Sequence, residues 1–223
     1  MITSLEYNVP LNLIQEACDA ALNDTSKNTI NQTNGSFFYD GWVIKPEYQG
    51  TVWEKILDTL PFPIGEARVI VLKPGQCYQG HADIDDRYHL NLSGSVSFLI
   101  DIDNKAMYET DQDGMWYLMD ASPRHSAANF GQVPRLQLVV RKLLTRNTLL
   151  DPVSVKLNVV RLDPLDARFE FDQIISPWLN QASKKSLITD FNYSGTSVML
   201  KIERHAVEAL KQLAFPEFEL EVL

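Results

Sequence analysis

Residues 66–102 read EARVIVLKPGQCYQGHADIDDRYHLNLSGSVSFLIDI, and the architecture of the chain can be inferred from them. The stretch contains three short apolar runs, RVIVL, RYHLNL and SVSFLIDI, which are separated by Pro, Gly, Asn and Asp. Short β-rich runs at intervals of about 8–12 residues are typical of an antiparallel sandwich or barrel. The runs MWYLM (115–119) and RLQLVVRK (135–142) continue this pattern. We therefore expect an all-β core between residues 66 and 142.

Helices are expected on the N-terminal side of this core. Residues 10–22 place apolar side chains at helical spacing, and Pro10 suits the first helical position. Thr51 followed by Glu54 matches a capping box, which predicts a second helix over 51–60. Between the two helices, the Asn-, Ser- and Thr-rich residues 23–36 predict a loop, and FFYDGWVI (37–44) predicts two short strands with a turn at 40–41.

The C-terminal third of the chain has a different pattern, in which strands and helices alternate. An extended run at 155–162 precedes a helix that opens at Ser176-Pro177, and the strand SVMLKI (197–202) precedes a helix from Ile202 to Leu213. FELEVL (218–223) closes the chain as either an internal strand or part of a dimer edge. We predict two domains: residues 1–148 with the β core and the N-terminal helices, and residues 149–223 as a small α+β domain.

Charge and cysteine content exclude several classes of function. The 223 residues contain 20 Lys and Arg against 29 Asp and Glu, so the net charge is −9, which argues against a nucleic acid partner. Cys18 and Cys77 are too few for a disulfide framework and indicate a reducing compartment. The N-terminus lacks the pattern of a secretory signal, and no apolar run reaches the ~20 residues of a membrane span. We expect a cytoplasmic protein without a membrane partner.

Two of the four histidines lie in a pattern suited to metal binding. His81 and Asp83 form an H-x-D pair, and in an extended segment residues i and i+2 share a face. His125, in DASPRHSAANF (120–130), would complete a set of two imidazoles and one carboxylate, which leaves coordination positions open on Fe(II). A single histidine in a β core is more often structural, and Asp85 is a rival ligand unless a turn at 85–86 removes it.

An arginine strengthens the metal hypothesis. Arg135 lies ten residues after His125 and opens the run RLQLVVRK. If the two residues lie on successive antiparallel strands, Arg135 can point into the same pocket and bind a carboxylate in bidentate fashion. The acid 2-oxoglutarate fits such a site, because one of its carboxylates chelates the metal with the keto oxygen and the other needs a buried cation.

The strand that contains Arg87, His89 and Asn91 alternates polar and apolar side chains, so one face is predicted to line a pocket. Arg87 and His89 are candidates for binding 2-oxoglutarate or a substrate carboxylate, or else for salt-bridged and hydrogen-bonded support of the site. Arg124 faces either substrate or solvent.

Together the segments HADIDDRYHLNL (81–92) and GMWYLMDASPRHSAANFGQVPRLQLVV (114–140) resemble the aspartyl/asparaginyl β-hydroxylase-like branch of the Fe(II)/2-oxoglutarate oxygenases, which includes free-proline hydroxylases. The resemblance covers about a third of the chain. It implies that His81, Asp83 and His125 bind iron and that Arg135 holds the distal carboxylate of 2-oxoglutarate. Asn129 matches an H-x-x-x-N of the family and would fix a loop or contact substrate.

These observations predict a mainly β fold with flanking helices, whose core is a double-stranded β-helix of the jelly-roll, cupin-like type. The resemblance implies hydroxylation of a free amino acid or of an Asp- or Asn-type side chain in a peptide, with Fe(II), 2-oxoglutarate and O2. Two alternatives stay open: a cupin-type metalloenzyme that does not use 2-oxoglutarate, and a non-catalytic module that binds a small acid.

Overall fold

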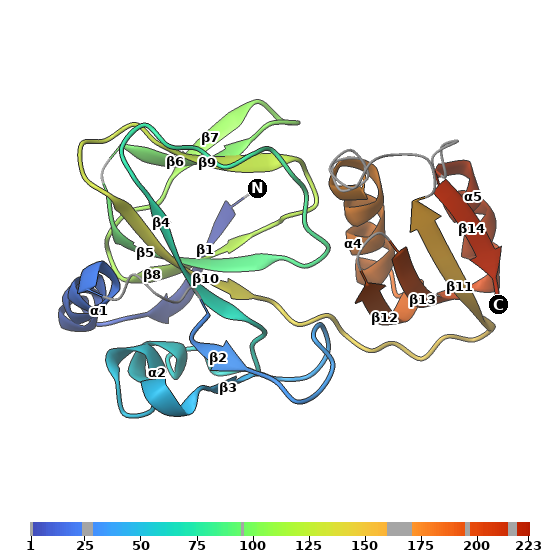
Figure 1. Cartoon of the computed structure of the whole chain (residues 1–223), viewed down its shortest axis with the longest axis horizontal. Coiled ribbons are helices and arrows are strands. Elements are labelled where there is room, and N and C mark those ends of the chain that lie inside the picture. Colours follow the sequence, from blue (N-terminus) through green and yellow to red (C-terminus); the bar gives the residue numbers. More distant parts are fainter. Residues whose placement is uncertain (1, 24–28, 95, 160–170, 195–196, 214–217) are drawn as a thin grey trace. The chain divides into compact units, whose positions relative to one another are not determined.

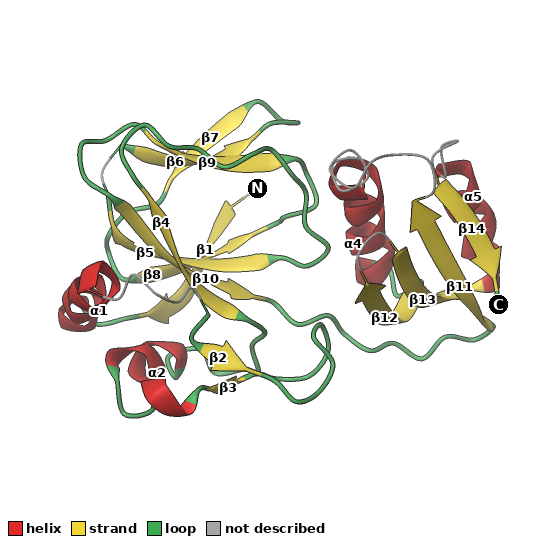
Figure 2. Cartoon of the chain, viewed as in Figure 1, coloured by secondary structure: helices red, strands yellow, loops and turns green. Residues whose placement is uncertain are grey.

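A computed structural model describes residues 2–23, 29–94, 96–159, 171–194, 197–213 and 218–223. The chain divides into two compact units (Figure 1). The first unit is Met1–Gly80 with Asp85–Leu143, and the second is Leu144–Leu223 with His81–Ile84. Antiparallel strands predominate and helices flank them (Figure 2), which confirms the mainly β class.

The first unit contains two main antiparallel sheets and a further pair of short strands. The larger sheet has the order β1-β8-β5-β10-β4, and the smaller has the order β7-β6-β9. The strands of the larger sheet are β1 (Ile2–Asn8), β4 (Ala67–Leu72), β5 (Arg87–Ser93), β8 (Met115–Met119) and β10 (Arg135–Arg141). Those of the smaller sheet are β6 (Ser97–Asp101), β7 (Ala106–Glu109) and β9 (His125–Asn129). The smaller sheet lies above the larger one in Figure 1.

The larger sheet has two buried faces of opposite character. One face is apolar and packs in a single cluster with the helices α1 (Leu11–Asn23) and α2 (Val52–Leu57). Its central residues are fully buried: Leu90, Leu92, Leu136, Leu138 and Val140. Because side chains alternate along a strand, the polar residues of the same strands share the opposite face. They are also buried, namely Arg87, His89, Asn91, Arg135 and Gln137.

The helix predicted over residues 10–22 is confirmed, and α1 buries Ile14 and Cys18. The helix predicted from Thr51 is also present, but its capping differs from the prediction. The Thr51 side chain makes no cap hydrogen bond and instead donates to the Tyr48 carbonyl at 2.6 Å. Glu54 still reaches back, and it accepts a hydrogen bond from the Gly50 N–H at 2.6 Å. Neither hydrogen bond of the predicted capping box is therefore formed, because the N–H of the N-cap residue Thr51 donates to the Tyr48 carbonyl and not to Glu54.

The strand pair predicted within residues 37–44 is wrong. A turn occupies 37–39, and the strand β3 (Val43–Ile44) pairs instead with β2 (Asn31–Gln32), which lies in the predicted loop. The 3-10 helix η1 (Pro46–Tyr48) follows. Residues 24–28 of that loop lie outside the described residues. The ring of Phe37 packs edge-on against Trp42 with centroids 5.3 Å apart, so aromatic packing within the turn replaces strand pairing.

The second unit contains a four-stranded antiparallel sheet of order β12-β13-β11-β14. Its elements are β11 (Pro152–Val159), η2 (Phe171–Ile175), α4 (Ser176–Lys184), β12 (Ile188–Ser194), β13 (Ser197–Glu203), η3 (Arg204–Ala206), α5 (Val207–Leu213) and β14 (Phe218–Val222). The predicted helix start at Ile202 is wrong, since this residue lies in β13. The end of the extended run at 155–162 lies outside the described residues. The final strand pairs with β11 and forms a sheet edge.

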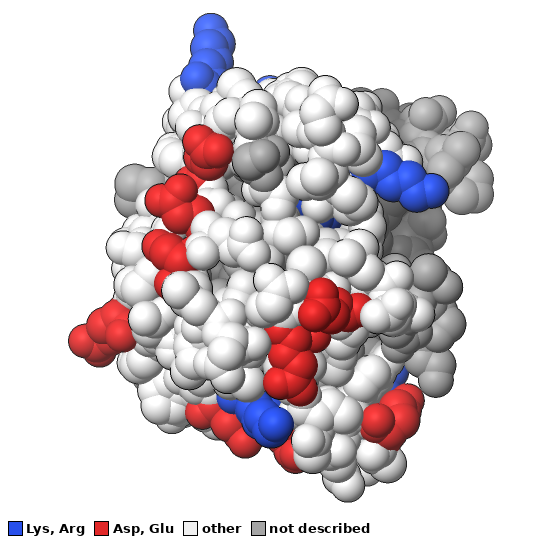
Figure 3. All heavy atoms as spheres, turned by 90° about the vertical axis from the view of Figure 1, so that its left-hand side faces the viewer, with Lys and Arg blue, Asp and Glu red and all other residues white. Residues whose placement is uncertain are grey.

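Among the described helices, none has the length and apolar character that a membrane crossing requires. Both cysteines are free thiols, with Cys18 buried and Cys77 exposed. On the face shown in Figure 3, Asp and Glu side chains cover more of the surface than Lys and Arg, in line with the net charge of −9.

Candidate metal centre

The structure brings together the three side chains that the sequence proposed as metal ligands. His81, Asp83 and His125 each offer one ligand atom, and these atoms lie within 4.8 Å of one another. His81 Nε2 is 3.7 Å from Asp83 Oδ2. His125 is buried, and its Nδ1 lies 2.9 Å from the Pro123 carbonyl. A ring that donates from Nδ1 to a backbone carbonyl turns the Nε2 lone pair toward a metal.

Hydrogen bonds to β9 explain how the H-x-D segment reaches this place. Cys77 forms an antiparallel bridge with Ala128, and the backbone N–H of Tyr78 donates to the Ala127 carbonyl at 2.8 Å. The Ser126 hydroxyl donates to the Tyr78 carbonyl at 2.6 Å. In an antiparallel register, residues after 78 approach the start of β9. The chain therefore arrives beside His125 within a few residues.

His125 and Arg135 open two successive strands, β9 and β10, as the expectation for Arg135 required. β9 and β10 are successive in the chain, but β9 belongs to the smaller sheet and β10 to the larger. Arg135 is only 2% exposed, and its Nε and Nη2 have no hydrogen-bond partner among the described residues. Burial lowers the pKa of Arg135 to about 10. A buried guanidinium with unpaired N–H groups is suited to an anionic ligand.

His89 lies on the same buried face. Burial is the main cause that lowers the pKa of His89 to about 3, and the nearby charge of Arg135 acts in the same direction, so its ring is neutral. His89 Nδ1 is 2.9 Å from Gln137 Oε1, whereas its Nε2 is buried without a partner in the described structure. Asn91 donates to the Thr110 carbonyl at 2.6 Å, and its Oδ1 is likewise unpaired. The polar face of the sheet therefore presents several unsatisfied atoms.

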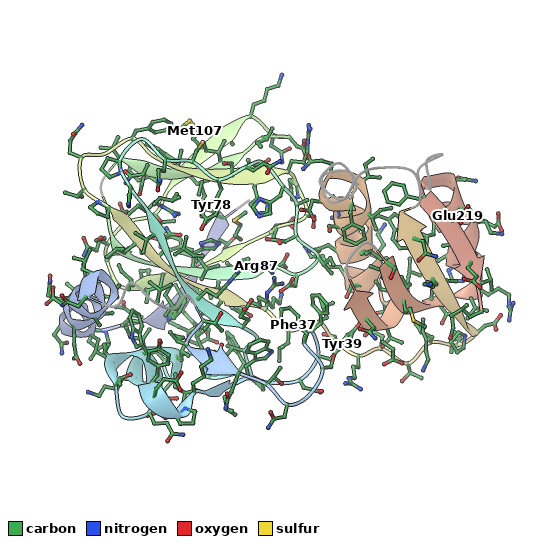
Figure 4. The ribbon with its side chains drawn as sticks, in the orientation of Figure 1. Phe37, Tyr39, Tyr78, Arg87, Met107 and Glu219 are labelled. Atoms are coloured by element: carbon green, nitrogen blue, oxygen red, sulfur yellow. The ribbon has the colours of Figure 1, made fainter. Side chains whose placement is uncertain are left out.

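Arg87 forms a buried ion pair, which is the supporting role that the sequence left open. Its Nη1 is 2.5 Å from Asp85 Oδ2, and Arg141 Nη1 contacts Asp85 Oδ1 at 2.6 Å. Asp85 is thus held between two arginines and is not part of the metal cluster. The guanidinium of Arg141 stacks over the Phe37 ring at 4.9 Å. Figure 4 labels Arg87 and Phe37 on the same side of the first unit.

The two tentative substrate residues have other contacts. Arg124 Nε pairs with Asp103 Oδ1 at 2.6 Å on the surface. Asn129 donates from Nδ2 to the carbonyls of Leu72 (2.9 Å) and Val133 (2.8 Å), and its Oδ1 accepts from the Gly131 N–H. The Asn129 amide is therefore engaged in fixing a loop, and the structure offers no support for a direct contact with substrate.

Gln137 and Thr110 are two buried polar residues beside His89 that sequence reasoning missed. Gln137 is fully buried and donates from Nε2 to Thr110 Oγ1 at 3.0 Å. A signal for Gln137 was present, since it is the one uncharged polar residue in the run RLQLVVRK and shares parity with Arg135. Thr110 follows β7 and carried no comparable signal.

Residues 51–143 match the family model described as aspartyl/asparaginyl beta-hydroxylase. The matched segment includes the cluster of His81, Asp83 and His125 together with Arg135. The resemblance of this segment to that family is therefore confirmed, and the class it indicates is that of the oxygenases that act as hydroxylases.

A solved prolyl-4-hydroxylase of Pseudomonas putida has a TM-score of 0.44 and 13% identity with the chain. The alignment covers 63% of this chain and 90% of that one. The comparison with curated proteins gave no match.

Proposed function

We propose that the protein is an Fe(II)/2-oxoglutarate-dependent dioxygenase that hydroxylates a C–H bond of a free amino acid or of an Asp- or Asn-type side chain. 2-Oxoglutarate would be converted to succinate and CO2. The observation that supports this most directly is the convergence of His81, Asp83 and His125 within 4.8 Å. The same matched segment contains the buried Arg135, whose Nε and Nη2 have no hydrogen-bond partner among the described residues.

The donor set fits iron. Two imidazoles and one carboxylate form the facial arrangement that leaves positions open on non-haem Fe(II). His81, Asp83 and His125 would hold the ion, and bound iron would supply the activation of O2 that C–H oxidation requires. The Pro123 carbonyl orients the His125 ring, and such outer contacts fix the direction of a ligand before the metal arrives.

The polar face of the larger sheet would bind the co-substrate. Arg135 would hold one carboxylate, and binding would satisfy its Nε and Nη2 N–H groups, which have no partner within the part of the chain that the structure describes. His89 would contribute a second contact beside it. Arg87, the first residue of β5, remains a proposed contributor to 2-oxoglutarate binding. Its guanidinium is held by the ion pair with Asp85. Arg124 remains the proposed anchor for a substrate carboxylate or amide at the surface.

We extend the proposal to the organisation of the chain. The two antiparallel sheets of the first unit support a double-stranded β-helix within residues 1–148, with residues 149–223 as an α+β domain. The unpaired side of β14 would be the edge at which a homodimer forms. A small-molecule or peptide substrate and a cytoplasmic location complete the proposal.

The proposal is tested with the whole protein under anaerobic conditions. Fe(II) and 2-oxoglutarate together should give the weak visible charge-transfer band of this class, and admission of air should release succinate. His125→Ala should lose both signals, whereas His205→Ala, which changes an exposed histidine of η3, should keep them. If neither signal appears in protein fully loaded with iron, the oxygenase assignment fails.

The same experiment separates the alternatives. A protein that binds Fe(II) but not 2-oxoglutarate would be a cupin-type metalloenzyme, and one that binds both without releasing succinate in air would be a binding module. For the substrate, free amino acids and Asn- or Asp-containing peptides are compared by the succinate release that each stimulates. Stimulation by neither group would contradict the proposed substrate class.

A further inference from the structure

Three buried side chains form a hydrogen-bonded chain between the larger sheet of the first unit and the residue that follows β7 of the smaller sheet. Thr110 follows β7, Gln137 lies on β10 and His89 lies on β5, and each is at most 5% exposed. Gln137 Nε2 donates to Thr110 Oγ1 at 3.0 Å, and Gln137 Oε1 lies 2.9 Å from His89 Nδ1. The chain ends at His89 Nε2, which is buried and has no partner among the described residues.

The orientation of the Gln137 amide determines the tautomer of His89. With Oε1 toward the ring, Nδ1 must carry the proton, because the amide oxygen only accepts hydrogen bonds. Nε2 then has a lone pair and no proton. A lone pair repels a carboxylate oxygen, so in this arrangement His89 does not assist Arg135 in binding an acid.

Rotation of the amide by half a turn reverses every donor in the chain. The Thr110 hydroxyl would then donate to Gln137 Oε1, Gln137 Nε2 would donate to His89 Nδ1, and the ring proton would move to Nε2. A hydroxyl serves equally as donor and acceptor, so Thr110 satisfies Gln137 in both orientations. In the reversed arrangement all three residues point their donors toward the unpaired end of the chain.

We propose that Thr110 and Gln137 are positioning residues that switch the tautomer of His89, so that Nε2–H donates to a carboxylate oxygen of 2-oxoglutarate when this acid binds beside Arg135. The inference rests on the proposed function. The carboxylate would supply the acceptor that His89 Nε2–H needs at the end of the hydrogen-bonded chain. The gain of this hydrogen bond would drive the rotation of the Gln137 amide.

Nuclear magnetic resonance of the imidazole nitrogens reports the tautomer directly. The protein is labelled with 15N-histidine and loaded with Zn(II), which is diamagnetic, and spectra are recorded without and with 2-oxoglutarate. His89 is assigned among the four histidines by the signal that His89→Gln removes. We expect a proton on Nδ1 before addition and on Nε2 after it. The same tautomer in both states would overturn the switch.

Variants of Thr110 separate a positioning role from a structural one. Thr110→Val removes the hydroxyl at nearly constant volume and should weaken 2-oxoglutarate binding about tenfold, the loss expected for one hydrogen bond to a charged group. Thr110→Ser keeps the hydroxyl and should restore the dissociation constant. Zn(II) affinity should be equal in all forms. Equal 2-oxoglutarate affinity in the Val and wild-type proteins contradicts the proposal.

The outcomes distinguish this inference from the function on which it rests. If Zn(II)-loaded wild-type protein does not bind 2-oxoglutarate in calorimetry, the proposed function and the switch both fail. If it binds the acid but His89 keeps one tautomer, only the switch fails. Gln137→Met, which removes the amide, offers a second variant and should weaken binding at least as much as Thr110→Val.

Discussion

Replacement of Arg135 by methionine should stabilise the ligand-free protein. The Arg135 guanidinium is buried, and its pKa is lowered from 12.5 to about 10, mainly by loss of hydration. A cation whose pKa is lower in the folded state destabilises folding at every pH below that pKa. At 1.36 kcal/mol per pKa unit, the cost near pH 7 is about 3 kcal/mol.

Methionine has a similar length and no charge, so Arg135→Met removes this cost but loses packing of the arginine stem, which we set at about 1 kcal/mol. The net gain is about 2 kcal/mol, or roughly 4–8 °C in Tm for a domain of this size. The wild-type protein should be further stabilised by metal with 2-oxoglutarate, and the variant should not respond to the acid.

Thermal and urea unfolding, each with and without 2-oxoglutarate in Zn(II)-loaded protein, measure both effects. Arg68→Met is the matched control, because Arg68 lies on the neighbouring strand β4, is 37% exposed and pairs with Glu66 at 3.5 Å. It should change stability by no more than about 1 kcal/mol and should keep the response to 2-oxoglutarate. A variant at Arg135 that is less stable than wild type, or that is still stabilised by 2-oxoglutarate, would refute the reasoning.

Three further predictions concern the same unit. His125→Ala should abolish Zn(II) binding measured by calorimetry while the far-UV circular dichroism stays unchanged; retained binding would remove His125 from the ligand set. Asp85→Asn should destabilise the protein by about 3–5 kcal/mol in urea, because the buried Arg87 loses its counter-charge and the partly buried Arg141 loses one of its two, and an effect below 1 kcal/mol would show that water already screens them. The lowered pKa of His89 means that the unfolded chain binds a proton that the folded metal-free protein does not, so this residue should make stability fall with decreasing pH, by about 1.4 kcal/mol per unit below pH 6.5. His89→Gln should reduce that slope, and an unchanged slope would contradict a neutral buried ring.

Strands with a clear alternating or apolar pattern could be predicted from the sequence, and strands without one could not. The runs at β4, β5, β6, β8 and β10 are rich in Val, Ile, Leu and aromatic residues, and all five are strands. β9 reads HSAAN, whose small and polar residues carry no strand signal although all five are buried. β1 and β7 carry only weak strand signals in their sequences. Their structure is decided by pairing with β8 and β6.

The candidate site could be predicted as a set of residues but not as an arrangement. The i, i+2 rule is enough to place His81 beside Asp83, and the structure adds His125 to them. The sequence does not reveal which sheet a strand joins: His125 and Arg135 lie on successive strands, and only the structure shows that these strands belong to different sheets. The contact between Gln137 and Thr110 joins residues far apart in the chain, and only the folded sheets bring it about.

Alternate residues of the same strands have different roles in the larger sheet, because one of its buried faces is apolar and the other is polar. On β5, Leu90 and Leu92 belong to the apolar cluster, whereas His89 and Asn91 line the polar interior. Under the proposed function, a substitution at His89 or Asn91 would alter which acid is bound, while the neighbouring leucines would continue to hold the domain together. Ligand preference in this scaffold can therefore diverge, by selection or by design, without the loss of folding that core changes usually bring.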